Sequence, residues 1–283
     1  MQNENMVRLV FFFGILLLVA CWEIVAARRP LTVSKFGRWG NNFGIIAVDT
    51  LLVKLVFSIA AVGVSAAAEK NGWGLLNYVE ASHVPSIVVG VLVLDLAIYF
   101  QHLMFHAVPL FWQLHMIHHT DLDVDVTTGF RFHPIEIIIS MGIKIAIVAA
   151  LGPPVIAVLI FEIALNGTSM FNHGNIQMPH ALDRLFRVFV VTPDMHRVRH
   201  SVIISETNSN FGFNLPWWDR LFGTYLAQPV AGHEKMTIGL SHFRKPEELT
   251  LPKLLILPFT GATGKCSLNH IGQDPKTIKT KNK

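Results

Sequence analysis

Four long apolar runs limit what this chain can fold into. They extend from Met6 to Ala27, from Phe43 to Ala68, from Val84 to about Phe100, and from Ile135 to Phe171. A helix needs about 20 mostly apolar residues to cross a bilayer, and the first three runs meet that length. Only 15% of the residues are charged, against roughly 25% in soluble domains. We therefore predict an all-α integral membrane bundle.

The fourth run differs because Gly152-Pro153-Pro154 interrupts it. Each arm then has about 15 to 17 residues, which is short for a span. We predict a helical hairpin that enters the bilayer and returns to the same side. The expected fold is about three spans plus this hairpin, in one membrane domain over residues 1–283. Within it, residues 1–82 form the N-terminal spans, 83–228 a catalytic region, and 229–283 an interfacial segment and basic tail.

Basic residues predict the orientation. The segment between the first two runs carries four of them and no acid, namely Arg28, Arg29, Lys35 and Arg38. Such loops face the cytoplasm, so the N-terminus is expected outside and the C-terminus inside. Leu18-Val19-Ala20-Cys21 looks like a lipoprotein processing site. The apolar run continues past Cys21 to the two arginines, which favours an uncleaved first span.

Shorter features complete this outline. Ala181 to Val191 resembles a short amphipathic helix, Leu251 to Phe259 an interfacial segment, and the polar tail from Gly272 a disordered one. Two cysteines exclude a disulfide framework and a cysteine-based zinc site. The net charge of +4 without a basic stripe argues against a nucleic-acid partner.

Histidine is the residue type that the apolar background does not explain. The chain has 14 of them, and eight follow ligand-like spacings. On a helix, residues three or four apart share a face, and Pro109 would separate two such helices. The eight candidate metal ligands are His102, His106, His115, His118, His119, His173, His196 and His200, and the weaker candidates are His133 and His180.

A single histidine on an apolar face is usually a hydrogen-bonded core residue, and this applies to His83, His233, His242 and His270 taken singly. Eight buried imidazoles without a metal would need many separate partners. Imidazole suits zinc, copper, iron and nickel alike, and spacing does not separate them. Eight ligands suffice for two ions with open positions, which favours oxygen activation. A transporter would need ligands across the bilayer instead of at one side.

The motifs around these histidines resemble the fatty acid hydroxylase/sterol desaturase superfamily of membrane di-iron enzymes. The resemblance covers roughly Val84 to Tyr225 and rests on five further segments: Thr127–Glu136, Asn172–Asn175, Thr192–Ser201, Asn210–Phe213 and Trp217–Tyr225. It implies two Fe ions held by histidines at the cytoplasmic face, with O2 as co-substrate. It also implies a membrane lipid substrate and an external electron-donor protein. The expected reaction is hydroxylation or desaturation of an unactivated C–H bond.

One position departs from the family pattern. The third histidine motif usually reads His-x-x-His-His, but Arg199 stands at its fourth position here. A guanidinium has no lone pair to donate to a metal, and Asp194 or Glu206 could pair with it. His133 or His180 could supply the lost ligand, one metal could keep fewer ligands, or the site could be impaired. The rival function is therefore a non-catalytic lipid- or metal-binding protein on a degenerate scaffold.

Several polar residues are candidates to support the histidines. Asp95 and Tyr99 lie on one helical stripe with His102 and His106, and Asp95 could accept a hydrogen bond from a metal-bound imidazole. The alternative is an ion pair of Asp95 with Lys54 or Lys144. Three further groups carry two readings each. Asp121, Asp123 and Asp125 are acceptors or loop residues, Glu136 is an acceptor or a helix-start acid, and Trp217 and Trp218 are interfacial anchors or line a lipid entry.

Overall fold

The computed structural model describes residues 2–261, and over this range the chain is helical and contains no strand, only two isolated β-bridges. Five stretches are long and apolar enough to cross a membrane. Their principal helices are α1 (Gln2–Val25), α2 (Lys35–Val56), α5 (His83–Ala107), α7 (Pro134–Leu151) and α8 (Val155–Asn172). The prediction of an all-α membrane bundle is confirmed. The predicted tail from Gly272 lies outside the described residues.

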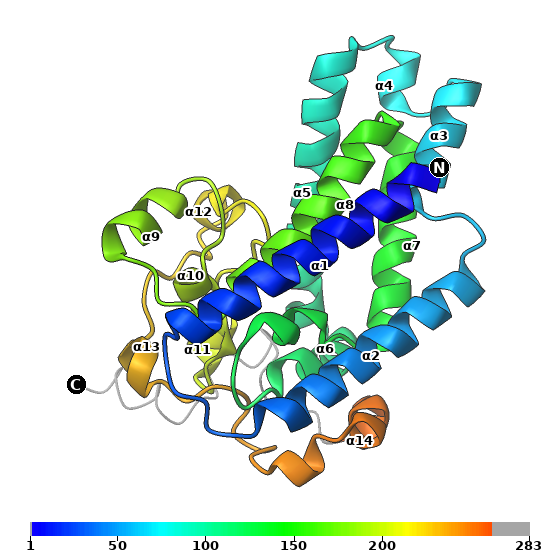
Figure 1. The fold of residues 1–283 in the computed structure, drawn as a ribbon. Helices are drawn as coiled ribbons and strands as arrows, with labels where there is room; N and C mark the ends of the chain where they lie inside the picture. The colour runs from blue at the N-terminus through cyan, green and yellow to red at the C-terminus, as the bar shows by residue number, and fades with distance from the viewer. Residues whose placement is uncertain (1, 262–283) are drawn as a thin grey trace.

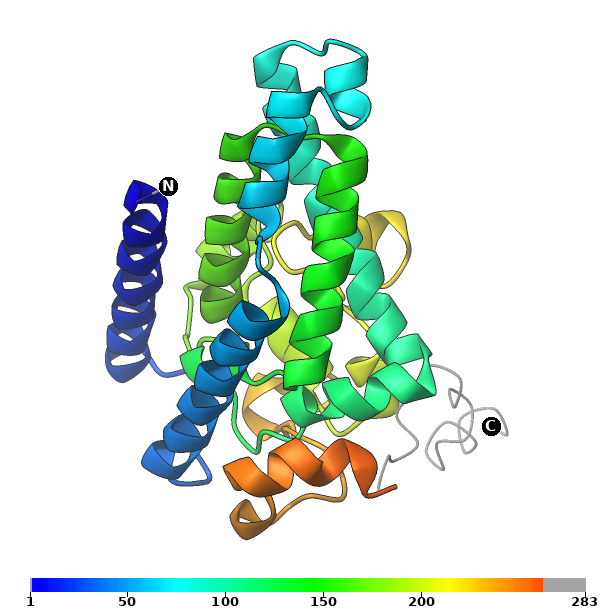
Figure 2. The ribbon, with the colours of Figure 1, turned by 90° about the vertical axis from the view of Figure 1, so that its right-hand side faces the viewer.

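The long helices run between two ends of the molecule (Figures 1 and 2). α5 packs against both α7 and α8, α1 lies against α8, and α2 lies against α7. α1 turns one apolar side away from the protein, and Leu17 and Leu18 on it are about two-thirds exposed. A surface of this kind is suited to contact with lipid tails.

The sequence suggested one continuous helix over the second apolar run, but the structure divides this run into two helices. α2 ends at Val56 with Phe57 in extended conformation, and α3 (Ala61–Asn71) begins after a short break. α3 packs against both α7 and α8. Both segments of the run therefore contact α7, and only α3 also contacts α8 closely. The four-residue α4 (Leu75–Tyr78) follows α3 and lies at the same end of the molecule as α3 (Figure 1).

The predicted interruption at Gly152-Pro153-Pro154 is present between α7 and α8, and each of these helices is long and apolar enough to cross a membrane. Each arm has 18 residues, slightly more than the sequence indicated, because α7 starts at Pro134 and α8 extends to Asn172. Gly152 ends α7 in the left-handed region, with φ of 63°. A Cβ on Gly152 would lie 2.3 Å from the carbonyl oxygen of Trp73. The turn therefore requires glycine and holds the α3–α4 connection against the hairpin.

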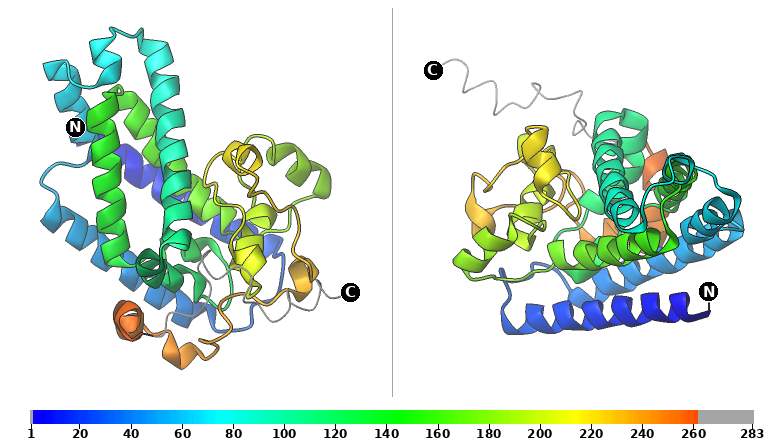
Figure 3. Two further views of the ribbon diagram at one scale, coloured as in Figure 1. Left: turned by 180° about the vertical axis from the view of Figure 1, so that it is seen from behind. Right: turned by 90° about the horizontal axis from the view of Figure 1, so that it is seen from above.

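The other end of the molecule carries the shorter elements (Figure 3). The predicted amphipathic helix ends at Phe186, earlier than expected, and the apolar segment after Thr250 forms two short helices. In chain order the elements are α6 (Pro109–His119), η1 (Val126–Phe130), α9 (His180–Phe186), α10 (Pro193–Arg197), η2 (Val198–His200), α11 (Ile204–Thr207), α12 (Trp217–Leu221), α13 (Gly232–Lys235), η3 (Pro246–Glu248), α14 (Leu251–Ile256) and η4 (Leu257–Phe259).

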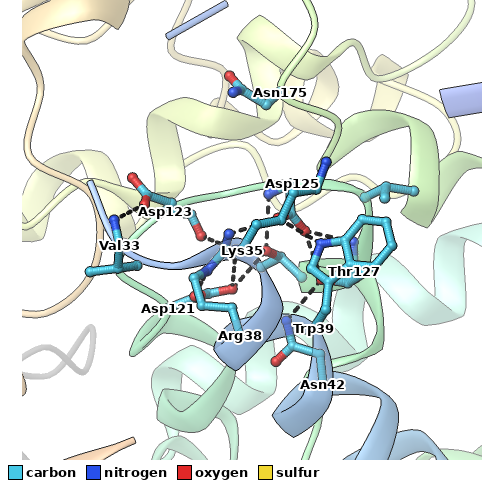
Figure 4. Close-up of polar contacts among 12 residues, drawn as sticks. Val33, Lys35, Arg38, Trp39, Asn42, Asp121, Asp123, Asp125, Thr127 and Asn175 are labelled. Carbon is cyan, nitrogen blue, oxygen red and sulfur yellow. Dashed lines mark hydrogen bonds and ion pairs between the residues drawn. The ribbon is translucent and has the colours of Figure 1, made fainter. Parts of the chain in front are cut away.

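A buried ion-pair network fastens α2 to the loop after α6 (Figure 4). The guanidinium of Arg38 donates to Asp121 Oδ1 at 2.6 Å and to Asp125 Oδ2 at 2.6 Å. Although burial raises the pKa of Asp121, the neighbouring Arg38 lowers it to about 2. Asp123 accepts instead from the backbone N–H groups of Thr32 and Val33. The three aspartates therefore hold the loop in place and do not accept hydrogen bonds from the histidines, which is the loop role named as the alternative in the sequence analysis.

Candidate metal centre

The structure gathers seven of the eight predicted ligands into two buried groups. One contains His118, His173, His196 and His200, and the other contains His102, His106 and His115. Within each group, the candidate ligand atoms lie within 4.8 Å of one another. The groups adjoin, because the ring centroids of His115 and His118 are 5.3 Å apart. Four separate chain segments thus converge on one buried centre.

Local sequence explains how these segments present their histidines. Pro109 is the first residue of α6 and separates it from α5, so the two helices meet at an angle and face each other with their imidazoles. Thr192 caps α10 through a bond from the Met195 N–H to its hydroxyl. Pro193 then sets the first helical turn. This arrangement directs His196 and His200 inward.

Two histidines are oriented by backbone carbonyls. His102 Nδ1 lies 2.8 Å from the carbonyl oxygen of Phe211, and His173 Nδ1 lies 2.6 Å from that of Ser169. A carbonyl oxygen only accepts, so each Nδ1 carries the proton and donates it. The lone pair of each ring is then on Nε2. Metal-binding histidines commonly have this arrangement.

Two more histidines are oriented by side chains. His115 Nδ1 donates to Glu136 Oε1 at 2.7 Å, and His106 Nδ1 lies 3.0 Å from Asn208 Oδ1. Glu136 stands in the first turn of α7, and the Pro134 start of this helix places it opposite α6. Glu136 therefore fits both predictions. It is an acid at the start of a helix, and it accepts a hydrogen bond from a histidine.

The inward-facing nitrogens lack conventional partners. His173 Nε2 lies 3.0 Å from both His118 Nε2 and His196 Nε2, so three ring nitrogens meet at one place. His102 Nε2, His115 Nε2 and both nitrogens of His200 are buried without a hydrogen-bond partner. Buried polar atoms are rarely left unpaired. Metal ions between the rings would satisfy these nitrogens together, so the donor set fits an imidazole-binding metal such as iron.

Electrostatics favours neutral imidazoles in this centre. Burial, and then the charge of neighbouring histidines, lowers the pKa of His118, His119, His196 and His200 well below the ordinary histidine value. Burial likewise lowers the pKa of His173 to about 4. A histidine must be unprotonated to bind a metal. The rings are therefore ready to bind a cation at neutral pH.

His119, the eighth predicted ligand, lies between the two groups. Its Nε2 is 3.2 Å from His106 Nε2, and its ring stacks on His200 with centroids 4.8 Å apart. Its Nδ1 is buried without a hydrogen-bond partner. It is therefore placed to contribute a ligand to either group.

Arg199 lies inside the centre and not at its edge. Its Nη2 donates to His106 Nε2 at 2.6 Å, and its Nη1 donates to the carbonyl oxygens of Asn210 and Ser209. The expected pairing with Asp194 or Glu206 is wrong. Asp194 pairs with Arg28 and Arg197, and Glu206 accepts from the Val230 N–H. Burial lowers the pKa of Arg199 to about 9.

The weaker ligand candidates lie outside both groups. His133 caps α7, with its Nδ1 accepting from the Ile135 N–H and its Nε2 lying 3.2 Å from the Leu255 carbonyl oxygen. His180 is an exposed residue at the start of α9. Neither is placed to replace the ligand missing at position 199.

The two supporting residues predicted on α5 contact other partners than the histidines. Asp95 Oδ2 accepts from Trp218 Nε1 at 2.8 Å and from the Leu215 N–H, while Lys144 pairs with Glu162. Tyr99 hydrogen-bonds Thr224 at 2.9 Å. Both tryptophans are hydrogen-bonded within the protein, since Trp217 Nε1 donates to the Val188 carbonyl oxygen, but Trp217 is also 44% exposed.

The sequence reasoning missed the residues that hold the Phe211 carbonyl in place. Asp219 Oδ1 accepts from the Phe211 N–H at 2.6 Å, and its Oδ2 accepts from the Gly212 N–H at 2.9 Å. Asn210 adopts a left-handed φ of 50° at the start of this loop. The Asn-Phe-Gly sequence followed by a nearby Asp was the available signal. Its function, orienting His102 through a carbonyl, could not be read from side-chain chemistry.

A cavity of about 380 Å³ reaches the metal centre from the membrane-spanning helices. His102 and His115 are part of its wall, and Phe105, Phe132 and Phe213 contribute apolar surface. A second cavity of about 680 Å³ adjoins it, lined mainly by apolar residues of α1, α2 and α8. Both lie at the level of the apolar helices, where a lipid can enter.

The fold and the centre define a class, namely integral membrane proteins with buried histidine clusters on a helical bundle that could hold metal ions. A family model described as fatty acid hydroxylase matches residues 87–224. The family match and the curated relatives together support the fatty acid hydroxylase superfamily for this chain. The match includes all eight histidines and confirms the family resemblance seen in the sequence.

Curated relatives agree with this assignment. The chain is 29% identical over 144 residues to the ornithine lipid hydroxylase OlsE of Rhizobium tropici, covering 50% of this chain and 42% of the relative. It is 28% identical over 153 residues to the alkylglycerol monooxygenase of Xenopus tropicalis and 27% identical to that of Homo sapiens, covering 52% of this chain and 31% of each relative. The matches thus span less than half the length of these relatives. No solved structure matches significantly.

Proposed function

We propose that this protein is a non-haem di-iron lipid hydroxylase. The observation that carries the proposal is the set of converging Nε2 atoms on histidines whose Nδ1 protons are already donated. His118, His173, His196 and His200 would hold one ion, and His102, His106 and His115 the other, with His119 between them. With O2 and two electrons, bound iron supplies the oxidising power to attack an unactivated C–H bond.

The reaction balances as lipid C–H, O2, two electrons and two protons giving lipid C–OH and water. The protein residues orient the imidazoles and exclude bulk water, since the ligand side chains are almost fully buried. The electrons would come from a separate donor protein. Hydroxylation is favoured over desaturation because the matched relatives are named a hydroxylase and monooxygenases. The basic loop between α1 and α2 supports a position of the site at the cytoplasmic face.

The test is iron content together with product formation. Purified protein is expected to contain about two irons per chain and to convert a lipid substrate only when O2 and a reductant are supplied. His118→Ala should abolish product and lower iron content. Lipid conversion by a metal-free preparation would contradict the proposal. Comparing lipid extracts from cells with and without the gene would identify the substrate.

A non-catalytic role is the second candidate, and Arg199 favours it. Its guanidinium occupies the lone pair of His106, so the His102 group has fewer free ligands than the His118 group. In this case the protein would bind lipid and one metal without turnover. A preparation with one tightly bound ion and unchanged lipid extracts would support this candidate.

A further inference from the structure

The cavity beside the metal centre contains three buried oxygens that accept hydrogen bonds and receive none. They are Asp49 Oδ1 from α2, Gln101 Oε1 from α5 and Glu136 Oε2 from α7. Asp49 is 6% exposed and Glu136 is 4% exposed. The other ends of two of these groups are engaged, because Gln101 Nε2 donates to Ser140 and Glu136 Oε1 accepts from His115. The residues that carry these oxygens all line the cavity, which therefore has a set of hydrogen-bond acceptors in its wall.

Such a set calls for a ligand that donates hydrogen bonds and carries positive charge. A buried acceptor without a donor costs stability, and a buried carboxylate without a cation costs more. Lys54 lines the same cavity but is exposed, and no ion pair joins it to Asp49 or Glu136, all three of which are described. Within the part of the chain that the structure describes, these oxygens of Asp49, Gln101 and Glu136 thus lack a hydrogen-bond donor, and the two carboxylates lack a paired lysine or arginine.

We propose that this cavity binds the protonated amine of an amino-bearing lipid head group. Asp49 forms its ion pair and Gln101 accepts a second hydrogen bond. This inference rests on the proposed lipid hydroxylase function and names the substrate class. Asp49 precedes the region matched by the family model, so the specificity comes from this chain's own N-terminal helices.

The neighbouring cavity suits the tail of the same lipid. It shares Ile46, Thr50 and Asn166 with the first cavity, and Phe11, Phe12 and Phe13 of α1 line it. An amine at Asp49 and a hydrocarbon tail among these phenylalanines would place the head-group end beside His102 and His115. The carbon that is attacked would then lie close to the amine and far from the end of the tail.

The test is ligand binding to the full chain in phosphatidylcholine nanodiscs, with empty nanodiscs correcting for partition. Labelled hexadecylamine is displaced by unlabelled hexadecylamine, hexadecanol or palmitate. We expect hexadecylamine to bind about tenfold or more tightly than the other two, as a charged hydrogen bond allows. Asp49→Asn should remove this preference. Glu80→Gln removes the same charge from an exposed position and should keep it.

Equal binding of the three probes would overturn the inference, and so would tighter binding of hexadecanol. A preference that survives in Asp49→Asn would also overturn it. Asp49→Glu, which keeps the carboxylate, should retain the preference and so separates recognition from misfolding. Binding needs neither O2 nor reductant. A preference for the amine without any hydroxylated product would support this inference and contradict the proposed function. Turnover without a preference for the amine would contradict this inference and leave the proposed function standing.

Discussion

Arg199 places a permanent cation against a ligand that a metal ion would use. Its Nη2 donates to His106 Nε2, while the guanidinium lies over the Phe211 ring, 4.8 Å from its centroid. The same loop therefore holds both Arg199 and the carbonyl that orients His102. If the two histidine groups hold metal ions as proposed, Arg199 would weaken the His102 group and leave the His118 group intact.

Replacing Arg199 by histidine should strengthen the weaker metal group. The variant Arg199→His removes the cation, frees His106 Nε2 and adds an imidazole. We expect the second ion to bind about tenfold more tightly, the size of effect that neighbouring groups have on metal affinity. Chelator competition measures it. Arg199→Lys is the control, since it keeps a cation and adds no ligand; unchanged affinity in Arg199→His would show that this position is no vacant ligand site.

Glu136→Gln tests the acceptor behind His115. The amide still accepts a hydrogen bond but loses the negative charge that makes the imidazole a better donor to metal. We expect affinity at the His102 group to fall about tenfold, with the His118 group unaffected. Glu80→Gln, an exposed charge loss, is the matched control. Equal losses at both groups would point to a general structural effect of Glu136.

Spacing predicted the histidines because helical periodicity is a local property. Residues three and four apart must share a face of α5 or α6, so the gathering of His102, His106 and His115 followed from sequence and one proline. Their hydrogen-bond partners did not follow. The carbonyls of Phe211 and Ser169 have no side-chain signature, and the contact of Arg199 with His106 depends on tertiary packing.

Among the elements, the hairpin turn is the one most dependent on a single residue. Gly152 needs a left-handed φ, and a Cβ there would meet the Trp73 carbonyl and the Asn77 side chain. Gly142, in the middle of α7, has open space around its Cα. The two glycines of one helix therefore provide a matched pair.

Gly152→Ala should destabilise the protein, whereas Gly142→Ala should not. We expect a loss of about 1 to 3 kcal/mol from backbone strain and the close contact at position 152. At position 142, alanine is a better helix former by about 1 kcal/mol. Thermal unfolding in detergent measures both variants. Equal melting temperatures for the two would contradict this account of the turn.

The Arg38 network is the element-level link between α2 and the loop after α6. Asp121→Asn leaves a buried guanidinium with a weakened partner, and we expect a loss of about 3 kcal/mol. The lowered pKa of Asp121, about 2, means that its stabilising effect is complete above its unfolded value and is lost only as pH falls through that range. The difference in melting temperature should therefore stay constant from about pH 5 to 8. A difference that vanishes at pH 5 would contradict the ion pair.

Element boundaries were harder to predict than the elements themselves. Apolar length predicted α1, α5 and the hairpin, because lipid solvation requires it. The break after Val56 was not predicted, since the run from Phe43 to Ala68 stays apolar through it. After the break α3 contacts α7 and α8, and such contacts belong to the assembled bundle and have no signature in the local sequence.

At the scale of the whole molecule, the long helices place the metal centre at one end of the bundle. The α3–α4 segment and the Gly152 turn lie at the other end (Figure 2). Arg28 and Arg29, in the connection between α1 and α2, belong to the end that carries the histidines (Figure 1). By the positive-inside rule we propose that this end faces the cytoplasm, where a soluble electron donor could reach it.

Cysteine labelling tests this orientation. Cys21 and Cys266 are replaced by serine, and a single cysteine is introduced at exposed Lys70 or exposed Lys245, one near each end. A membrane-impermeant maleimide should label Lys70→Cys in intact cells and Lys245→Cys only after permeabilisation. Labelling in lysed membranes, where both positions should react, controls for access. The opposite pattern would place the histidine centre outside, and an electron donor in the cytoplasm would then be excluded.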